Sequence, residues 1–162
     1  MSFGQTVPSA GSRFANEDDI REVVIRKLME DWYKSGDKSE AQAKNHTDKE
    51  IAAHLNFKVF FVSVNGRDPD RQFLDRFRDI PRTIKGVSQS KISKHRLAVV
   101  DRKTGQFGII FSADEIHWKD ASSVEVQGGY HCDGRCAAGE TYELRREHGK
   151  WILKSARMNW IS

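Results

Sequence analysis

The segment HCDGRC (131–136) places a histidine and both cysteines of the chain within six residues. Imidazole and thiolate groups at close spacing can bind zinc, and a pair of thiols can carry out redox chemistry. A structural zinc site needs a complete tetrahedral set of ligands, which this one short segment would have to supply alone. Thioredoxin-type redox motifs have the spacing Cys-X-X-Cys at a helix N-terminus, whereas three residues intervene here. We therefore expect no metal and no redox centre, and we interpret the segment as the tip of a β-hairpin.

Cys132 and Cys136 also have the spacing at which a disulfide can close across such a tip. The bond requires the two Cα atoms to approach within ~4.4–6.8 Å. It forms in an oxidising compartment, and the sequence leaves the redox state open.

A second candidate for chemistry is the segment SADEIHW (112–118). In a regular strand Asp114 and Glu115 point to opposite faces, so they do not form a carboxylate pair acting on one substrate. Asp114 would share a face with Trp118, and an aspartate in an apolar cavity beside Tyr130 or Tyr142 is the arrangement of a general base with a phenolic partner. The interpretation that we favour is plainer: an outward-facing aspartate near the end of a strand.

The other histidines give weaker signals. They lie in polar connections or turns, where a solvated side chain is the usual state: His46, His54, His95 and His148. The sequence contains no HExxH motif, no glycine-rich phosphate loop and no Ser-His-Asp arrangement. We expect no cofactor.

The composition is that of a soluble globular protein, with 38% hydrophobic and 31% charged residues in a chain of 162. No apolar run is long enough to span a membrane, and residues 1–15 lack the apolar core of a signal peptide. We expect a cytoplasmic protein, or an exported or periplasmic one if a leader precedes this sequence. The net charge is +4, but aspartates are interleaved with the basic residues between Arg67 and Lys103, so we do not expect nucleic-acid binding.

The first half of the chain predicts helices and one strand. Residues 1–15 are interpreted as a flexible tail and 16–162 as one domain, with Asn16 capping a helix that stops at Ser35-Gly36. A short helix is expected at 48–55, presenting Ile51 and Leu55.

After this second helix, the aromatic and β-branched segment FKVFFVSV (57–64) predicts a buried strand that ends at the Asn65-Gly66 turn. A further helix should begin with Asp68 as its cap and Pro69 as its first residue, bury Phe73, Leu74 and Phe77, and end at Pro81.

In the second half of the chain, apolar and polar residues alternate with a period of two, as in β-strands. Segments 95–101 and 106–118 flank a short connection containing Gly105 and are expected to pair as a hairpin. Strands over 122–132, 140–147 and 150–162 follow, the last two joined by the His148-Gly149 turn. An antiparallel sheet with one polar face needs a cover on the other, and only the N-terminal helices can supply it. The predicted fold is therefore α+β, with N-terminal helices packed on a curled antiparallel β-sheet.

Three segments resemble uncharacterised bacterial small proteins of the NTF2-like, or cystatin-like, superfamily. They are KVFFVSVNGRDPDRQFLDRFRD (58–79), VVDRKTGQFGIIFSADEIHWKDASSVEVQGGY (99–130) and GETYELRREHGKWILKSARMNWIS (139–162). The resemblance implies a cone formed by a bent sheet and its helices around a cavity. Members are often exported or lipid-anchored, and the superfamily includes isomerases, dehydratases and transport adaptors, so the fold alone assigns no function.

These observations favour a non-catalytic module that binds a small apolar ligand or a protein partner in or on the curled sheet. The aromatic residues expected to line the site are Phe111, Trp118, Tyr130 and Tyr142. The alternative is a cofactor-free isomerase, dehydratase or hydrolase that uses Asp114 with Tyr130 or Tyr142. A third hypothesis is a homodimer formed through an exposed face of the sheet.

Overall fold

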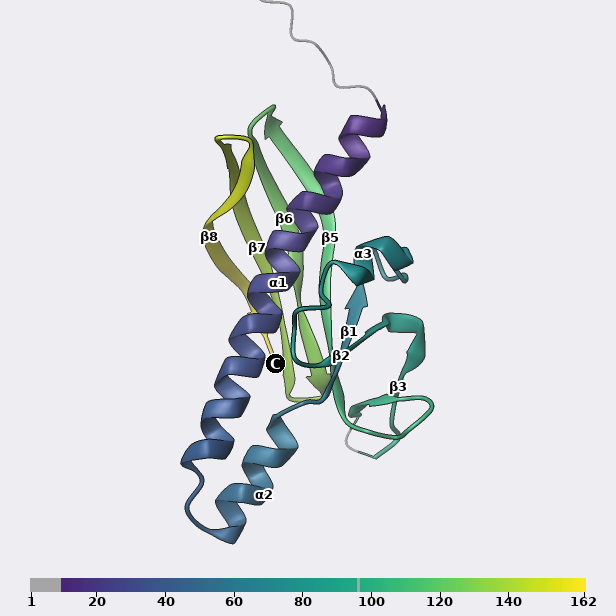
Figure 1. Ribbon diagram of the computed structural model, residues 1–162, viewed down its shortest axis with the longest axis vertical. Coiled ribbons are helices and arrows are strands. Elements are labelled where there is room, and N and C mark those ends of the chain that lie inside the picture. Colours follow the sequence, from purple (N-terminus) through teal and green to yellow (C-terminus); the bar gives the residue numbers. More distant parts are fainter. Residues whose placement is uncertain (1–9, 96) are drawn as a thin grey trace, which may run out of the picture.

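The computed structural model describes residues 10–95 and 97–162 and shows an α+β protein (Figure 1). Its helices in those residues are α1 (Ala10–Gln42), α2 (His46–Leu55), α3 (Arg71–Asp75) and the 3-10 turn η1 (Val87–Gln89). Its strands there are β1 (Val59–Ser63), β2 (Thr83–Gly86), β3 (Ser90–Ile92), β4 (Val99–Asp101), β5 (Gly108–Asp120), β6 (Ser123–Asp133), β7 (Cys136–Glu147) and β8 (Lys150–Ile161). The predicted fold class, helices followed by a curled and mostly antiparallel sheet, is confirmed.

The main sheet has six strands in the order β2-β1-β5-β6-β7-β8. Strands β5 to β8 form the expected antiparallel meander, whereas β1 runs parallel to both of its neighbours, β2 and β5. The His148-Gly149 turn between β7 and β8 is confirmed, and both residues have the positive φ of a tight hairpin turn (50° and 76°). Strands β3 and β4 form a separate two-stranded sheet.

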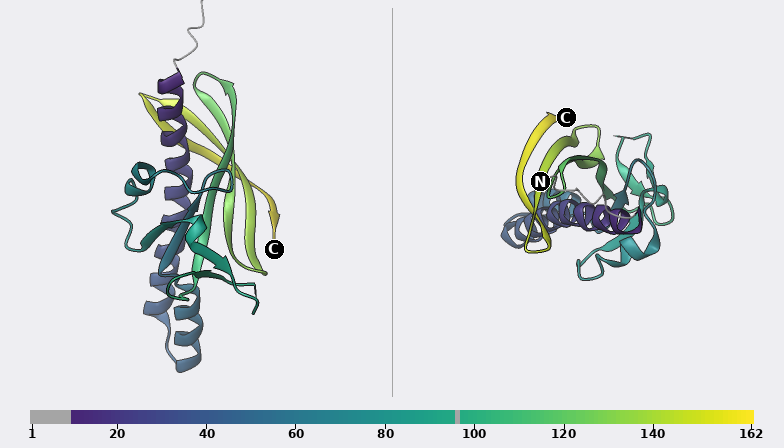
Figure 2. Two further views of the ribbon diagram at one scale, coloured as in Figure 1. Left: turned by 90° about the vertical axis from the view of Figure 1, so that its right-hand side faces the viewer. Right: turned by 90° about the horizontal axis from the view of Figure 1, so that it is seen from above.

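Helix α1 lies along one face of the sheet, and the sheet curves around it (Figure 2). The core lies between them, because apolar residues of α1 pack against the inward-facing residues of β5 to β8. The α1 side chains in this core include Ile20, Val24, Ile25, Leu28 and Met29. None of the helices in the described residues combines the length and the apolar character needed to cross a membrane.

Two predictions about the ends of α1 are wrong. The helix begins at Ala10, so Asn16 lies inside it and is no cap; residues 1–9 of the predicted tail lie outside the described part of the chain. The helix also continues through Ser35-Gly36 to Gln42. Gly36 has a packing role there, because a Cβ built on it would lie 2.5 Å from Asn56 Oδ1. The close approach of Asn56, and not the end of the helix, explains why a glycine occupies position 36.

The cap of α2 was not predicted, and the cap of α3 differs from the predicted one. Asn45 caps α2 by accepting a hydrogen bond from the Asp48 amide at 2.8 Å. Asp70 caps α3 through the Phe73 amide at 2.8 Å, so the prediction that Asp68 is the cap is wrong. The carboxylate of Asp68 instead accepts a hydrogen bond from the Ser88 amide at 2.8 Å.

The faces of these helices are only partly as expected. In α2 the buried residue is Ala52, while Ile51 and Leu55 are exposed. In the α3 region Phe73 and Phe77 are buried, as predicted, but Leu74 is only partly buried and the helix ends at Asp75, not at Pro81.

The predicted hairpin between segments 95–101 and 106–118 is also wrong. Strand β4 pairs with β3, in the register Ser90 to Asp101, and meets the second segment only at the isolated bridge between Val100 and Phe107. A strand has only two edges, and those of β5 are occupied by β1 and β6. The parallel strand β1 thus takes the place that a local hairpin would have given to β4.

Candidate functional site

The aromatic residues expected to line a cavity pack into the core instead. Phe111 and Tyr142 are buried. The Tyr130 ring meets the Trp32 ring of α1 edge-on, with centroids 5.0 Å apart. The Trp118 ring likewise meets that of Trp151 on β8 at 5.6 Å. The space inside the curl of the sheet is thus occupied by side chains of the sheet and of α1 at all four positions.

Asp114 does not share a face with Trp118 as the alternation predicted. The register between β5 and β6 shifts between Ala113 and Ile116, which is a β-bulge. Residue Arg21 of α1 bonds the bulged backbone, donating from Nε and Nη2 to the Asp114 carbonyl at 3.2 and 2.9 Å. The Asp114 carboxylate accepts a hydrogen bond from the Asn65 amide, at the end of β1, at 2.8 Å. Burial raises the pKa of this carboxyl above its ordinary value, and the bond from Asn65 partly opposes that rise.

The carboxyl of Asp114 and the hydroxyl of Tyr142 lie on opposite faces of the sheet. Tyr142 belongs to the core on the α1 side and its hydroxyl donates to the Glu140 carboxylate. Burial, with the neighbouring Glu140, raises the pKa of this phenol above its ordinary range. The structure therefore separates Asp114 from Tyr142, whereas Asp114 and Tyr130, the other pair of the enzyme hypothesis, line one recess.

Cys132 and Cys136 form a disulfide across the tip of the β6–β7 hairpin, with their Cα atoms 5.2 Å apart. Asp133 shapes this tip by accepting a hydrogen bond from the Arg135 amide at 2.7 Å. The interpretation of the segment as a hairpin tip matches its position between β6 and β7. Across residues 10–95 and 97–162, no three His, Cys, Asp or Glu side chains are placed to hold a metal ion together.

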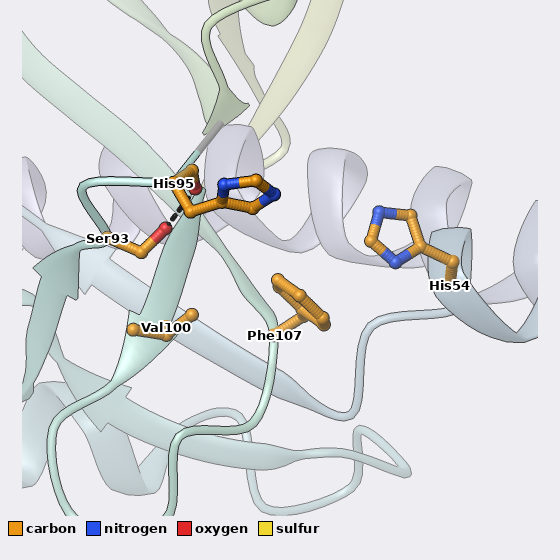
Figure 3. Close-up of a pocket in the computed structure, with 5 residues that line it drawn as sticks. All are labelled: His54, Ser93, His95, Val100 and Phe107. Atoms are coloured by element: carbon orange, nitrogen blue, oxygen red, sulfur yellow. Dashed lines mark hydrogen bonds between the residues drawn. The ribbon is translucent and has the colours of Figure 1, made fainter. Parts of the chain in front are cut away.

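The largest recess that we describe lies beside the sheet, between α2 and the β3–β4 pair (Figure 3). We call it the α2 recess; its volume is about 440 Å³, and its lining residues are His54, Ser93, His95, Val100 and Phe107. His54 comes from the last turn of α2, Ser93 and His95 from the connection between β3 and β4, Val100 from β4, and Phe107 from the residue before β5. Three separate parts of the chain therefore build one site.

The α2 recess has an apolar floor and polar groups at its rim. Phe107 is 43% exposed, and the His54 ring meets it edge-on with centroids 4.7 Å apart. The imidazoles of His54 and His95 point toward each other across the recess (Figure 3). The Ser93 hydroxyl donates to the His95 carbonyl and so helps to hold the connection that carries this histidine. An imidazole can donate or accept a hydrogen bond, so the rim offers both kinds of group to a ligand.

Sequence reasoning missed this recess. In the sequence His54 and His95 have polar neighbours typical of solvated surface residues, while Phe107 lies in the segment 106–118 predicted as a strand. No local motif joins the three, because they meet only through the packing of α2 beside the β3–β4 pair.

A second recess, of about 300 Å³, is lined by residues of β5 to β8, among them Asp114, Tyr130 and His131. We call it the outer-face recess, and the residues that matter to its chemistry are Ser112, Asp114, Gln127, Gly139, Asn159 and Trp160. Ser112 and Gly139 alternate along their strands with the core residues Phe111 and Ala138, which places them on the opposite face.

In comparisons with known proteins, no family model, no curated protein and no solved structure matches this chain. Its function is therefore inferred from the geometry of its own residues.

Proposed function

We propose that this protein is a non-catalytic binding module that holds a small apolar ligand in the α2 recess. The observation that carries the proposal is a concave site of about 440 Å³ with Phe107 and Val100 as its apolar surface and two histidines at its rim. Ligand sites typically have about 300–1,000 Å³, a mostly apolar lining and a few polar groups that orient the ligand. The α2 recess has each of these properties.

The exposed surface of Phe107 supplies the driving force for binding. Removing apolar surface from water contributes roughly 25 cal/mol per Å². Phe107 is 43% exposed in the folded protein. A ligand that covers its ring would remove this apolar surface from water. The imidazoles of His54 and His95 would then bond one polar group of the ligand, such as a hydroxyl, a carbonyl or a carboxylate.

A protein partner is the second candidate for the same recess. Leu55 and Leu97, on the two elements that carry His54 and His95, are 47% and 56% exposed. Exposed apolar side chains around a recess are typical of protein contact surfaces, where one apolar side chain of the partner fills the recess. A partner contact would therefore depend on Leu55 and Leu97 as well as on Phe107, whereas a small ligand held inside the recess would depend on Phe107 alone.

We also propose that the fold is NTF2-like. The order of elements supports this assignment, with a long N-terminal helix, a strand and helix, and then a curled antiparallel meander. The proposed ligand site differs from the cavity expected inside the cone, because aromatic side chains occupy the curl and the recess lies beside it. For the enzyme alternative, Asp114 and Tyr142 lie on opposite faces, while Asp114 and Tyr130 line one recess in which the Tyr130 ring is packed against Trp32.

Titration with the fluorescent apolar probe 8-anilinonaphthalene-1-sulfonate tests the ligand proposal. We expect saturable fluorescence enhancement that becomes at least tenfold weaker in affinity in Phe107→Ala, because the main apolar surface of the recess is lost. Ile152→Ala is the matched control, since it removes a comparably exposed apolar side chain that lines neither recess. Leu55→Ala and Leu97→Ala should bind the probe as the natural chain does.

Two results would contradict the proposal: no saturable enhancement with the natural chain, or equal affinities in Phe107→Ala and the natural chain. Far-ultraviolet circular dichroism of each variant ensures that the probe reports on folded protein. A native mass spectrum of the purified protein, compared with the denatured spectrum, would in addition reveal the mass of any ligand that remains bound.

A further inference from the structure

The outer-face recess crosses four adjacent strands, from Ser112 and Asp114 on β5 to Asn159 and Trp160 on β8. Neighbouring strands lie about 4.8 Å apart, so the recess is an elongated groove roughly 14 Å across. Its floor includes Gly139, which has no side chain to fill the groove. A ligand that occupies its full length must therefore be longer than a single small ring.

Trp160 forms one end of this groove. Its indole lies over Gly139, because a Cβ built on that glycine would be 2.6 Å from Trp160 Cε2. Any side chain at position 139 would displace the ring. The indole nevertheless remains 54% exposed, so it presents aromatic surface to solvent from a position that the glycine defines. A large aromatic group fixed in this way can stack on the flat face of a ligand ring at a low entropic cost.

The middle of the groove carries polar groups held in fixed positions. Asn159 Nδ2 donates to Thr141 Oγ1 at 2.9 Å and to Gln127 Oε1 at 3.2 Å, which orients both carboxamides. Among the described residues, the Nε2 group of Gln127 has no hydrogen-bond acceptor, so it can donate to a ligand. Asp114 and Ser112 supply a carboxylate and a hydroxyl at the other end.

The charge of the groove restricts the class of ligand. Within the described part of the chain, its lining contains no lysine and no arginine, while Asp114 supplies a carboxylate. Phosphates, nucleotides and other anions would meet no lysine or arginine there, and His131 is the one basic side chain in this described lining. Carboxylates and carboxamides instead suit ligands with many hydroxyl groups, because one such side chain can bond two adjacent hydroxyls.

We propose that the outer-face recess binds a neutral oligosaccharide, with one sugar ring stacked on Trp160. Gln127 and Asn159 bond the hydroxyls of the central part, and Asp114 bonds those of the far end. This site is separate from the α2 recess, and the proposal does not depend on the function assigned to that recess.

Saturation-transfer difference NMR tests the proposal with four neutral disaccharides, each at millimolar concentration: maltose, cellobiose, lactose and N,N′-diacetylchitobiose. We expect transfer to at least one of them. That signal should fall at least tenfold in Trp160→Ala and remain in Trp160→Phe, which keeps an aromatic face. Ile152→Ala is the matched control, because Ile152 is an exposed apolar residue of the same strand outside the groove.

A second variant keeps the test independent of any effect of Trp160 on folding. Gln127→Ala leaves Trp160 in place and should weaken binding of the same sugar at least threefold. The proposal is overturned if none of the four sugars shows transfer to the natural chain, or if the transfer survives unchanged in Trp160→Ala.

Discussion

The Asn56 side chain occupies the space beside α1 that a Cβ on Gly36 would need. Asn56 is itself bound there, since Arg82 Nη2 donates to its Oδ1 at 2.6 Å and to Asp37 Oδ1 at 2.7 Å. Arg82 Nε also donates to the Phe57 carbonyl at 2.9 Å. A glycine in the middle of a helix thus allows the segments that carry α2, β1 and β2 to dock closely against α1.

Gly36→Ala should destabilise the protein, although alanine is the better helix former. The helix propensity gain is about 1 kcal/mol, whereas crowding a packed site costs about 1–3 kcal/mol and here also displaces a hydrogen-bonded side chain. We expect a net loss of free energy of unfolding, measured by urea denaturation. Ser35→Ala, at the neighbouring exposed position, should change it by less than about 0.5 kcal/mol. A more stable Gly36→Ala variant would contradict the packing role of Gly36.

The ion pair of Asp101 with Lys85 should contribute to acid sensitivity. Lys85 Nζ lies 3.0 Å from Asp101 Oδ1, and the Thr104 hydroxyl donates to Oδ2 at 2.7 Å. The bond from Thr104, with the one from Lys85, holds the pKa of Asp101 below its ordinary value of 3.8. A lowered pKa stabilises the fold above the pKa of the unfolded chain, and this contribution disappears as the pH falls through the folded-state pKa.

Asp101→Asn should therefore lower stability at pH 7 and reduce the loss of stability below the ordinary pKa of 3.8. Urea denaturation at a series of pH values measures both effects. Asp75→Asn is the control, because Asp75 makes a more exposed ion pair with Arg78. Equal pH dependence in Asp101→Asn and the natural chain would show that the pair makes no net contribution.

Asp114→Asn should behave in the opposite way. Because burial raises the pKa of Asp114, its contribution to stability is present below the ordinary pKa of 3.8 and is lost as the pH rises through the folded-state pKa. The asparagine avoids this charge and keeps an oxygen for the Asn65 amide, so stability at pH 7 should be unchanged or higher.

The same variant tests whether binding in the α2 recess is independent of Asp114. Affinity for 8-anilinonaphthalene-1-sulfonate should stay within twofold of that of the natural chain, since Asp114 does not line the α2 recess. A large loss of stability, or of probe binding, would mean that Asp114 has a role that its position does not explain.

The disulfide should stabilise the hairpin tip by limiting the freedom of the unfolded chain. For a loop as short as Cys132 to Cys136 the chain-entropy model gives about 2 kcal/mol. Urea denaturation with and without dithiothreitol measures the difference, and a mass two hydrogens lower without reductant identifies the bond. The double variant Cys132→Ala with Cys136→Ala should be insensitive to the reductant. Equal stability of the natural chain in both conditions would contradict this prediction.

Local patterns in the sequence were sufficient for much of the fold. The alternation in 122–132, 140–147 and 150–162 and the His148-Gly149 turn predicted β6 to β8 correctly, because side-chain alternation and turn chemistry act between near neighbours. The helix predicted before the sheet is found as α1, whose apolar residues pack on the sheet. The predicted strand at 57–64 is found as the fully buried β1.

The errors arose where a residue's role depends on a distant partner. Gly36 appeared to be a helix stop because Asn56 is not beside it in the sequence, and Asp114 changed face because of a bulge within β5. The pairing of β5 with β1 instead of β4 is likewise non-local.

By itself, the sequence determined the order of the main helices and strands and the buried strand β1. The tertiary structure alone decided the strand partners, the filling of the curl by aromatic rings, and the two recesses. The physical reason is that His54 and Phe107, like Asp114 and Trp160, come from distant segments, and no local periodicity encodes the packing that brings them together.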